Sequence, residues 1–178
     1  MGSWFDVLAV GIMVGCIALG MRTGFLRQAF LLLAMYISAV LAAQYYAHIS
    51  GFARMVAPAS NPQMTDVLSF IFLFALFTLV VTLLIWAGYR ETRLPGLPLV
   101  DNLGGALFGI VGGMFAIALT IMLATYTISA PWPEGSAVKY ALSIGLGNSA
   151  LEPVFSLPMP LFQGALRPLM PANIPFIF

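Results

Sequence analysis

Hydrophobic side chains gather along this chain in four long stretches that are separated by short, more polar connections. The stretches cover about residues 4–21, 25–46, 67–89 and 99–128. A helix needs about 20 mainly apolar residues to cross a bilayer, because it rises about 1.5 Å per residue through a hydrocarbon core of about 30 Å. We therefore expect an all-α integral membrane protein with about four transmembrane helices.

Composition points to the same class of protein. Of the 178 residues, 61% are hydrophobic and 7% are charged, and the formal net charge is +1. Soluble domains carry about a quarter charged residues, so most of this surface must face the lipid bilayer. The near-neutral charge argues against a nucleic-acid partner. Cys16, the single cysteine, lies in an apolar run and is typical of a small buried hydrophobe.

Arginine positions predict the orientation in the membrane. The first connection contains Arg22 and Arg27, and the third contains Arg90 and Arg93, whereas the second contains only Arg54. Positive charge in short loops favours the cytoplasmic side. We therefore expect the first and third connections in the cytoplasm and both termini outside it.

Small residues at four-residue spacing predict where helices pack closely. Gly105, Gly109 and Gly113 follow this spacing in the fourth stretch, and Gly11 and Gly15 follow it in the first. Without a hydrophobic drive in lipid, such residues let helix backbones approach one another. We expect the first, second and fourth helices to form the tight part and the phenylalanine-rich third helix to lie outside. Whether the glycines contact the same chain or another one is open.

The N-terminal end of the first helix has a local signal of its own. Ser3 and Asp6 have the spacing of a capping box, in which two side chains satisfy free amides of the first helical turn. An acid in this turn also complements the helix dipole.

The chain changes character after residue 128. Eight of the twelve prolines follow this point, and the apolar pieces at about 137–146 and 161–166 are too short to span a bilayer. We expect a four-helix transmembrane domain at 4–128 and a tail of short helices at 129–178. This tail would lie in the membrane interface, on the four helices or on a partner.

If the tail docks on a partner, its large apolar side chains are the expected contacts, because such residues are enriched in interfaces. The candidates are Phe155, Met159, Phe162 and Met170.

Candidate catalytic chemistry is sparse. A nucleophile with a base, or paired carboxylates, would be needed, and the sequence shows neither arrangement. His48, the single histidine, has no second ligand nearby and is best interpreted as an interfacial side chain beside Tyr45 and Tyr46; whether it binds a metal or pigment is open. We expect no enzyme activity, no metal and no cofactor.

Transport also has little support within one chain. A solute pathway usually places charged groups in the middle of the membrane, and here the acids and bases fall near helix ends. A pathway between copies of the chain remains open.

Two segments together resemble the colicin V production protein (CvpA) family. Asp6 precedes an apolar helix, and residues 22–29 then read Arg-Thr-Gly-Phe-Leu-Arg-Gln-Ala. Residues 94–101 read Leu-Pro-Gly-Leu-Pro-Leu-Val-Asp and lead into the glycine-rich fourth stretch. The resemblance covers about residues 4–128. The positions that carry it are Asp6, Arg22, Gly24, Phe25, Arg27 and Asp101.

The chain also departs from the family pattern. Thr23 stands where the family usually has arginine, Gln28 replaces an acid, Asn102 replaces a base, and Gly112 stands where an arginine is common. The resemblance implies a bacterial inner-membrane protein linked to colicin secretion and envelope maintenance. Its diverged charges suggest a member that keeps the scaffold.

Two functions follow as hypotheses. One is a non-catalytic CvpA-like protein of envelope maintenance, secretion or assembly. The other is an accessory structural subunit of a larger membrane complex. In both, the expected partners are the lipid bilayer and other membrane subunits or further copies of the chain.

Overall fold

The computed structural model describes residues 3–56, 61–88, 98–129, 131–132 and 136–169. Its four long helices are α1 (Trp4–Thr23), α2 (Phe25–Val56), α3 (Pro62–Gly88) and α4 (Pro98–Ser129). Each is long and apolar enough to cross a membrane. The expectation of an all-α protein with four transmembrane helices is thus confirmed for the described part of the chain.

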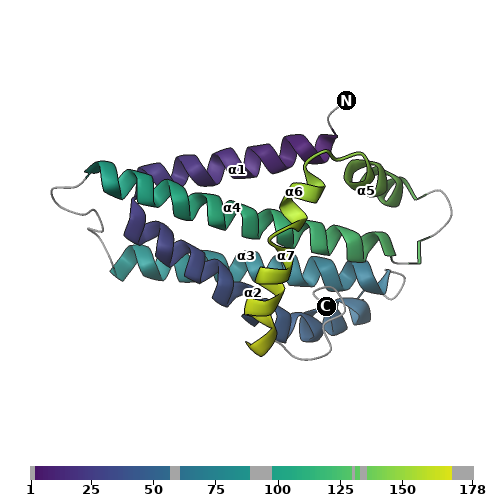
Figure 1. The fold of residues 1–178 in the computed structure, drawn as a ribbon. Coiled ribbons are helices and arrows are strands. Elements are labelled where there is room, and N and C mark those ends of the chain that lie inside the picture. The colour runs from purple at the N-terminus through teal and green to yellow at the C-terminus, as the bar shows by residue number, and fades with distance from the viewer. Residues whose placement is uncertain (1–2, 57–60, 89–97, 130, 133–135, 170–178) are drawn as a thin grey trace.

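The long helices associate as two pairs (Figure 1). α1 packs mainly along α4, and α2 packs mainly along α3, while contacts between α2 and α4 join the pairs. Contacts between α1 and α2 are few by comparison. The expectation that α3 lies outside a tight group of the other three helices is therefore wrong.

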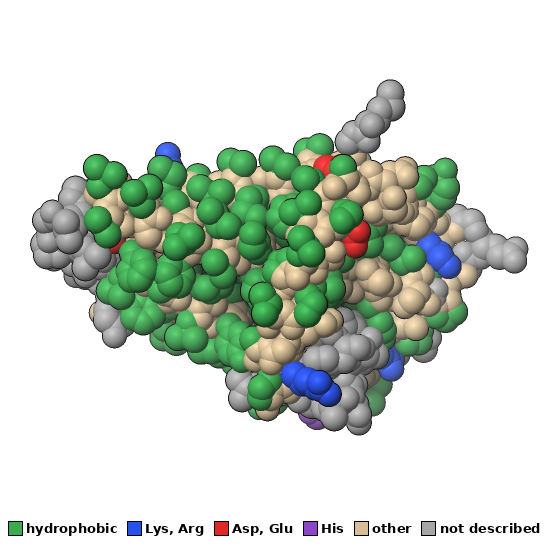
Figure 2. All heavy atoms as spheres, in the orientation of Figure 1, with side chains coloured by type: hydrophobic (Ala, Val, Ile, Leu, Met, Phe, Trp, Pro, Cys, Tyr) green, Lys and Arg blue, Asp and Glu red, His purple; other side chains and the backbone are tan. Residues whose placement is uncertain are grey.

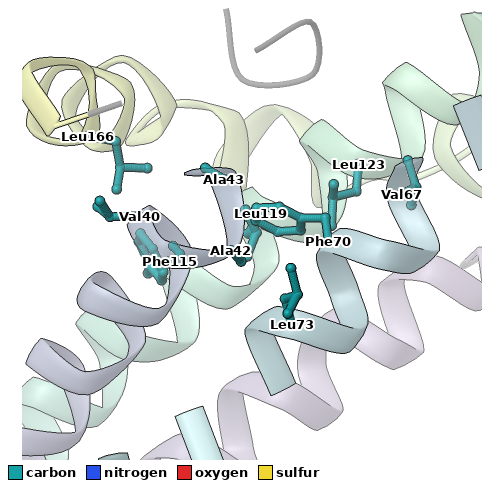
Figure 3. Close-up of a cluster of buried hydrophobic side chains, with 11 residues drawn as sticks. Val40, Ala42, Ala43, Val67, Phe70, Leu73, Phe115, Leu119, Leu123 and Leu166 are labelled. Atoms are coloured by element: carbon teal, nitrogen blue, oxygen red, sulfur yellow. The ribbon is translucent and has the colours of Figure 1, made fainter. Parts of the chain in front are cut away.

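Complementary side-chain sizes explain why α2 and α3 pack so closely. Phe70 of α3 is fully buried in a cluster with Ala39, Ala42 and Ala43 of α2 (Figure 3). Leu119 of α4 belongs to the same cluster. Small residues on one helix thus leave room for an aromatic ring on the other, and a phenylalanine-rich helix needs no small residues of its own.

The outer surface of the bundle is apolar. Figure 2 shows hydrophobic side chains over most of one face, with only scattered charged side chains. Large apolar groups such as Leu83, Leu84 and Trp86 on α3 are more than half exposed. Such a surface matches a lipid environment, because water-soluble monomers rarely expose large contiguous apolar patches.

The tail folds back onto the long helices. It forms α5 (Ala137–Gly147), α6 (Glu152–Ser156), α7 (Met159–Leu166) and the 3₁₀ turn η1 (Arg167–Leu169). In Figure 1, α5 lies near the start of α1, and the segment α6–α7 runs across the long helices. The division of the chain into a domain at 4–128 and a tail at 129–178 stays a prediction.

Side chains suggested above as partner contacts are engaged within the chain. Phe155 is buried in a cluster with Phe5 and Ile117, and Met159 packs against this cluster. Phe162 meets Phe115 edge to face, with ring centroids 5.2 Å apart. Phe155 is thus enclosed within the chain, whereas Met159 and Phe162 are half-buried. A partner contact of the tail stays a prediction. Met170 lies outside the described residues.

Candidate functional site: two buried aspartates at opposite ends of the bundle

Asp6 lies in the first turn of α1 and organises the start of that helix. The Ser3 amide donates to Asp6 Oδ2 at 2.9 Å, and the Phe5 amide donates to Ser3 Oγ at 3.2 Å. The two side chains form a capping box, as their spacing predicts. Only 8% of Asp6 is exposed, so its carboxylate needs further hydrogen-bond donors.

The tail supplies these donors from the turn between α5 and α6. Ser149 Oγ donates to Asp6 Oδ1 at 2.6 Å, the Leu151 amide donates to the same oxygen at 3.2 Å, and the Ala150 amide donates to Oδ2 at 3.3 Å. Ser149 Oγ in turn accepts from the Glu152 amide at 3.0 Å. The Asp6 carboxylate therefore accepts hydrogen bonds both from the start of α1 and from the turn that leads into α6.

Further contacts fix α5 against the same helix end. Ser3 Oγ donates to the Gly145 carbonyl, and Trp4 Nε1 donates to the Ala141 carbonyl at 3.1 Å. Gly145 lies so close to the Trp4 indole that a Cβ atom there would collide with the ring. Glycine is thus required at this approach for steric reasons.

Asp101 plays a related part at the opposite end of the bundle. It lies in the first turn of α4, is 3% exposed, and its Oδ1 accepts from the Phe25 amide at 2.9 Å. Phe25 is the first residue of α2, and helix starts leave amides without a partner. Asp101 therefore caps α2 from a different helix, where an N-cap side chain would normally do so.

Gly24 makes this cap possible. It joins α1 to α2 with a φ of +84°, which is strained for residues with a side chain. A Cβ atom on Gly24 would also collide with the Asp101 carboxylate. The family-like positions Gly24, Phe25 and Asp101 thus come together in space, although 76 residues separate Phe25 from Asp101.

The glycines of α4 lie against α1. Gly105 meets the backbone of Gly20, and a Cβ atom on Gly109 would stand 2.5 Å from the Cys16 carbonyl oxygen. Gly113 faces Met13. These contacts bring the two backbones together along α4, and Gly20 is the glycine that α1 contributes.

Gly11 and Gly15 lie elsewhere. Both are exposed, and a Cβ atom on either would have no neighbour within 4 Å. They face away from α4 and do not take part in the packing between α1 and α4. Their predicted packing role is therefore wrong for contacts within the described chain, and a contact with another chain stays a prediction.

The two arginines of the family-like turn differ in their surroundings. Arg22 is exposed in the last turn of α1. The Arg27 guanidinium lies 4.0 Å from the ring centroid of Trp86, a cation–π contact between the start of α2 and the end of α3. Gln28, which stands where an acid is usual, accepts from Thr23 Oγ1 at 3.3 Å.

A family model described as Colicin V production protein matches residues 5–155. The chain belongs to this family. No curated protein and no solved structure matches it. The match starts next to Asp6 and extends into α6, so the CvpA family includes the segment that Asp6 binds as well as the four long helices.

Family membership and the four apolar helices together identify a multi-pass membrane protein. Among the residues that the structure describes, no group of three or more His, Cys, Asp or Glu side chains could hold a metal ion. His48 of this CvpA-family chain is exposed on α2, with its ring 6.3 Å from that of Tyr45.

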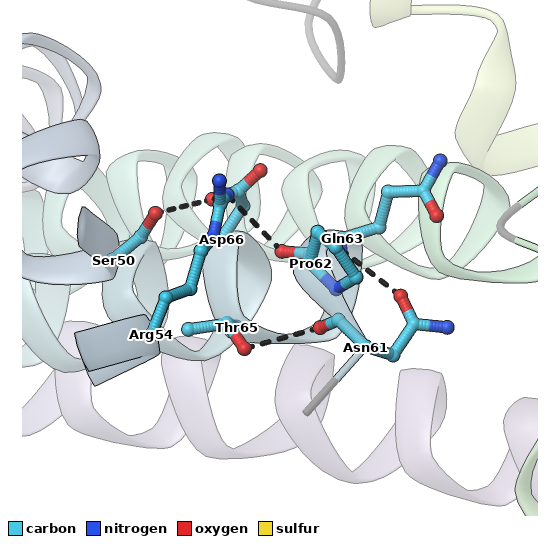
Figure 4. Close-up of polar contacts among 7 residues, drawn as sticks. All are labelled: Ser50, Arg54, Asn61, Pro62, Gln63, Thr65 and Asp66. Atoms are coloured by element: carbon cyan, nitrogen blue, oxygen red, sulfur yellow. Dashed lines mark hydrogen bonds and ion pairs between the residues drawn. The ribbon is translucent and has the colours of Figure 1, made fainter. Parts of the chain in front are cut away.

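A third polar cluster was missed from the sequence. Arg54 at the end of α2 forms an ion pair with Asp66 near the start of α3, and Ser50 Oγ donates to the same carboxylate at 2.5 Å (Figure 4). Asn61 caps α3, because its side-chain oxygen accepts from the Gln63 amide at 3.1 Å. Ser50 and Arg54 lie one helical turn apart, and this spacing is the sequence signal that could have indicated the cluster.

Proposed function

We propose that this CvpA-family protein is a non-catalytic scaffold of the bacterial inner membrane that acts in envelope maintenance, secretion or assembly. The observation that carries the proposal is the use of its buried acids. Asp6 ties α1 to the turn before α6, and Asp101 ties α4 to the start of α2. Each carboxylate accepts backbone amides, which is the use expected of a structural group and not of a general base.

The proposed orientation follows from charge. The exposed Arg22 lies at the end of the bundle that contains Asp101, and Arg27 lies there too. Positive residues favour the cytoplasmic side, so this end is cytoplasmic and both termini are outside. Reporter fusions after residue 93 and at residue 178 test the orientation. A cytoplasmic reporter at residue 178 would overturn it.

An accessory role in a larger membrane complex is the second candidate. The exposed Gly11 and Gly15 favour it, because small residues on a membrane helix permit close contact with another helix. The partner would be another membrane subunit or a second copy of the chain.

Deletion and rescue in the source bacterium test the first function. Loss of the protein should raise sensitivity to detergents and to antibiotics that the envelope excludes. Wild type and Ser143→Ala, a change at an exposed α5 hydroxyl, should restore resistance, whereas Asp6→Ala should not. An unchanged envelope in the deletion strain would overturn the proposal.

Purification from native membranes in mild detergent separates the two candidates. A partner that is retained by the wild type and lost with Gly11→Leu supports the accessory role. Recovery of the chain alone, together with an envelope defect in the deletion strain, favours the self-sufficient scaffold.

A further inference from the structure

A groove of about 440 Å³ runs between α3 and α4 and is covered at one end by α5. Its volume falls within the range of about 300–1,000 Å³ that is usual for sites of small ligands. α3 lines it from Met64 to Phe74, α4 lines it from Ala116 to Thr127, and α5 contributes Val138 and Leu142. Because α3 and α4 make few direct contacts, this groove opens between two membrane-spanning helices.

The length of the groove matches one leaflet of a bilayer. Its walls on α3 and α4 each extend over about ten residues, which corresponds to about 15 Å of helix. One leaflet accounts for about half of the 30 Å hydrocarbon core. The groove begins close to the start of α3 at Pro62 and the end of α4 at Ser129. It therefore extends from the level of the membrane interface to the middle of the bilayer.

The walls suit a flexible apolar chain. Nearly all lining side chains are aliphatic, aromatic or thioether groups, and the two threonines turn their hydroxyls to their own helix. Thr120 Oγ1 donates to the Ala116 carbonyl at 2.8 Å, and Thr127 Oγ1 donates to the Leu123 carbonyl at 2.7 Å. With these donors engaged, a polar ligand would lose hydration without gaining hydrogen bonds.

A basic residue lies next to a groove-lining residue on α5. Val138 and Leu142 of α5 are one turn apart and line the groove, and the exposed Lys139 follows Val138. The first turn of α5 contains no acid, and Asp66 on α3 is neutralised by Arg54. A lysine at this level keeps its ammonium group in the interface, where anionic lipid phosphates lie.

We propose that this groove binds an acyl chain of an anionic glycerophospholipid and that Lys139 pairs with the lipid phosphate. The inference is independent of the proposed function, because it rests on the apolar groove and on the charge of Lys139. It also gives α5 a role as an interfacial cover over the bound chain.

Native mass spectrometry of the detergent-purified chain, titrated with phosphatidylglycerol, tests the proposal. The wild type should retain one lipid at low lipid-to-protein ratio. Ala124→Trp places a ring in the groove and should abolish this retention. The matched control Ala18→Trp, on the exposed face of α1, should bind as the wild type does. Circular dichroism melting checks that both variants fold.

Charge variants test the phosphate contact without filling the groove. Lys139→Gln should bind phosphatidylglycerol about fivefold more weakly, since one basic residue near anionic lipid contributes on this scale. Its affinity for diacylglycerol, which has no phosphate, should not change. Arg167→Gln, an exposed change elsewhere in the tail, is the control.

Three outcomes would overturn the proposal. The first is a wild-type chain that retains no lipid. The second is equal lipid retention by Ala18→Trp and by a folded Ala124→Trp. The third is that Arg167→Gln and Lys139→Gln weaken the affinity for phosphatidylglycerol equally. If Ala124→Trp does not fold, the comparison of Lys139→Gln on the two lipids decides.

Discussion

At the end of the bundle where α1 begins, Asp6 accepts hydrogen bonds from Ser149 and from the amides around it. At the other end, Asp101 accepts from Phe25, and the backbones of α1 and α4 meet at Gly20 and Gly105. Both ends use a buried aspartate to cap a helix. The Asp6 end is held by hydrogen bonds to a segment that is distant in sequence. The Asp101 end is held in addition by two helix backbones that pack too closely to admit a side chain.

This difference separates two ways to hold membrane helices together. A close backbone contact excludes even a methyl group and gains dispersion energy over a long seam. A carboxylate with several donors tolerates more local movement, but its loss leaves all of those donors without a partner. The close contact of the α1 and α4 backbones at Gly20, Gly105 and Gly109, here called the glycine seam, should therefore determine the stability of the bundle. Asp6 should determine whether the tail stays attached.

The largest expected effect is at the seam. Gly109→Leu should destabilise the chain by about 3 kcal/mol or more, because a side chain there collides with the backbone of Cys16 and Ile17. Thermal unfolding in detergent, followed by circular dichroism, measures the change. Gly11→Leu is the matched control, since Gly11 faces open space, and it should shift stability by about 0.5 kcal/mol or less. Equal melting temperatures for the two variants would contradict the claim that the glycine seam stabilises the bundle.

An intermediate effect is expected at Asp6. Asp6→Ala should destabilise the chain, because Ser149 and the amides of Ala150 and Leu151 lose their acceptor, and it should release the segment from Ser149 onward. Limited proteolysis should then cut the tail of the variant faster than that of the wild type. Ser143→Ala, which removes a hydroxyl bonded to the Tyr140 carbonyl, is the control. Equal tail protection in Asp6→Ala and wild type would show that apolar contacts alone hold the tail.

The smallest of the three effects is expected at Asp101. Asp101→Ala should cost about 1 kcal/mol, as the loss of a helix N-cap usually does, because the glycine seam still holds this end. Hydrogen exchange should accelerate at the Phe25 amide and remain unchanged in the middle of α2. Asn102→Ala, at the exposed neighbour, should leave exchange as in the wild type. A loss larger than that of Asp6→Ala would reverse the proposed contrast between the two ends.

The runs of hydrophobic residues predicted the four long helices, because the thickness of a bilayer imposes a minimum apolar length. It placed the end of the second helix near residue 46, whereas α2 continues to Val56. The polar residues around His48 lower hydropathy there without stopping the helix, since hydropathy reports the lipid contact and not the backbone hydrogen bonds. The capping box at Ser3 and Asp6 was visible because it is local.

Contacts between distant segments were not accessible in this way. Nothing near Asp6 in the sequence indicates Ser149, which lies 143 residues away. The choice between Gly11 and Gly20 as the contact of α4 depends on which face α1 turns inward, and both faces of α1 are apolar. The pairing of α2 with α3 required knowing that alanines on one helix accept Phe70 of the other.

The attachment of the tail at Asp6 also determines the order in which the molecule can be completed during its synthesis. α1 leaves the ribosome first and enters the bilayer with its aspartate still lacking the donors that Ser149 and Leu151 provide. These donors emerge only after α4 has been made. The surroundings of Asp6 are therefore completed last, and a chain that ends before residue 149 leaves this carboxylate with the Ser3 amide but without Ser149, Ala150 and Leu151.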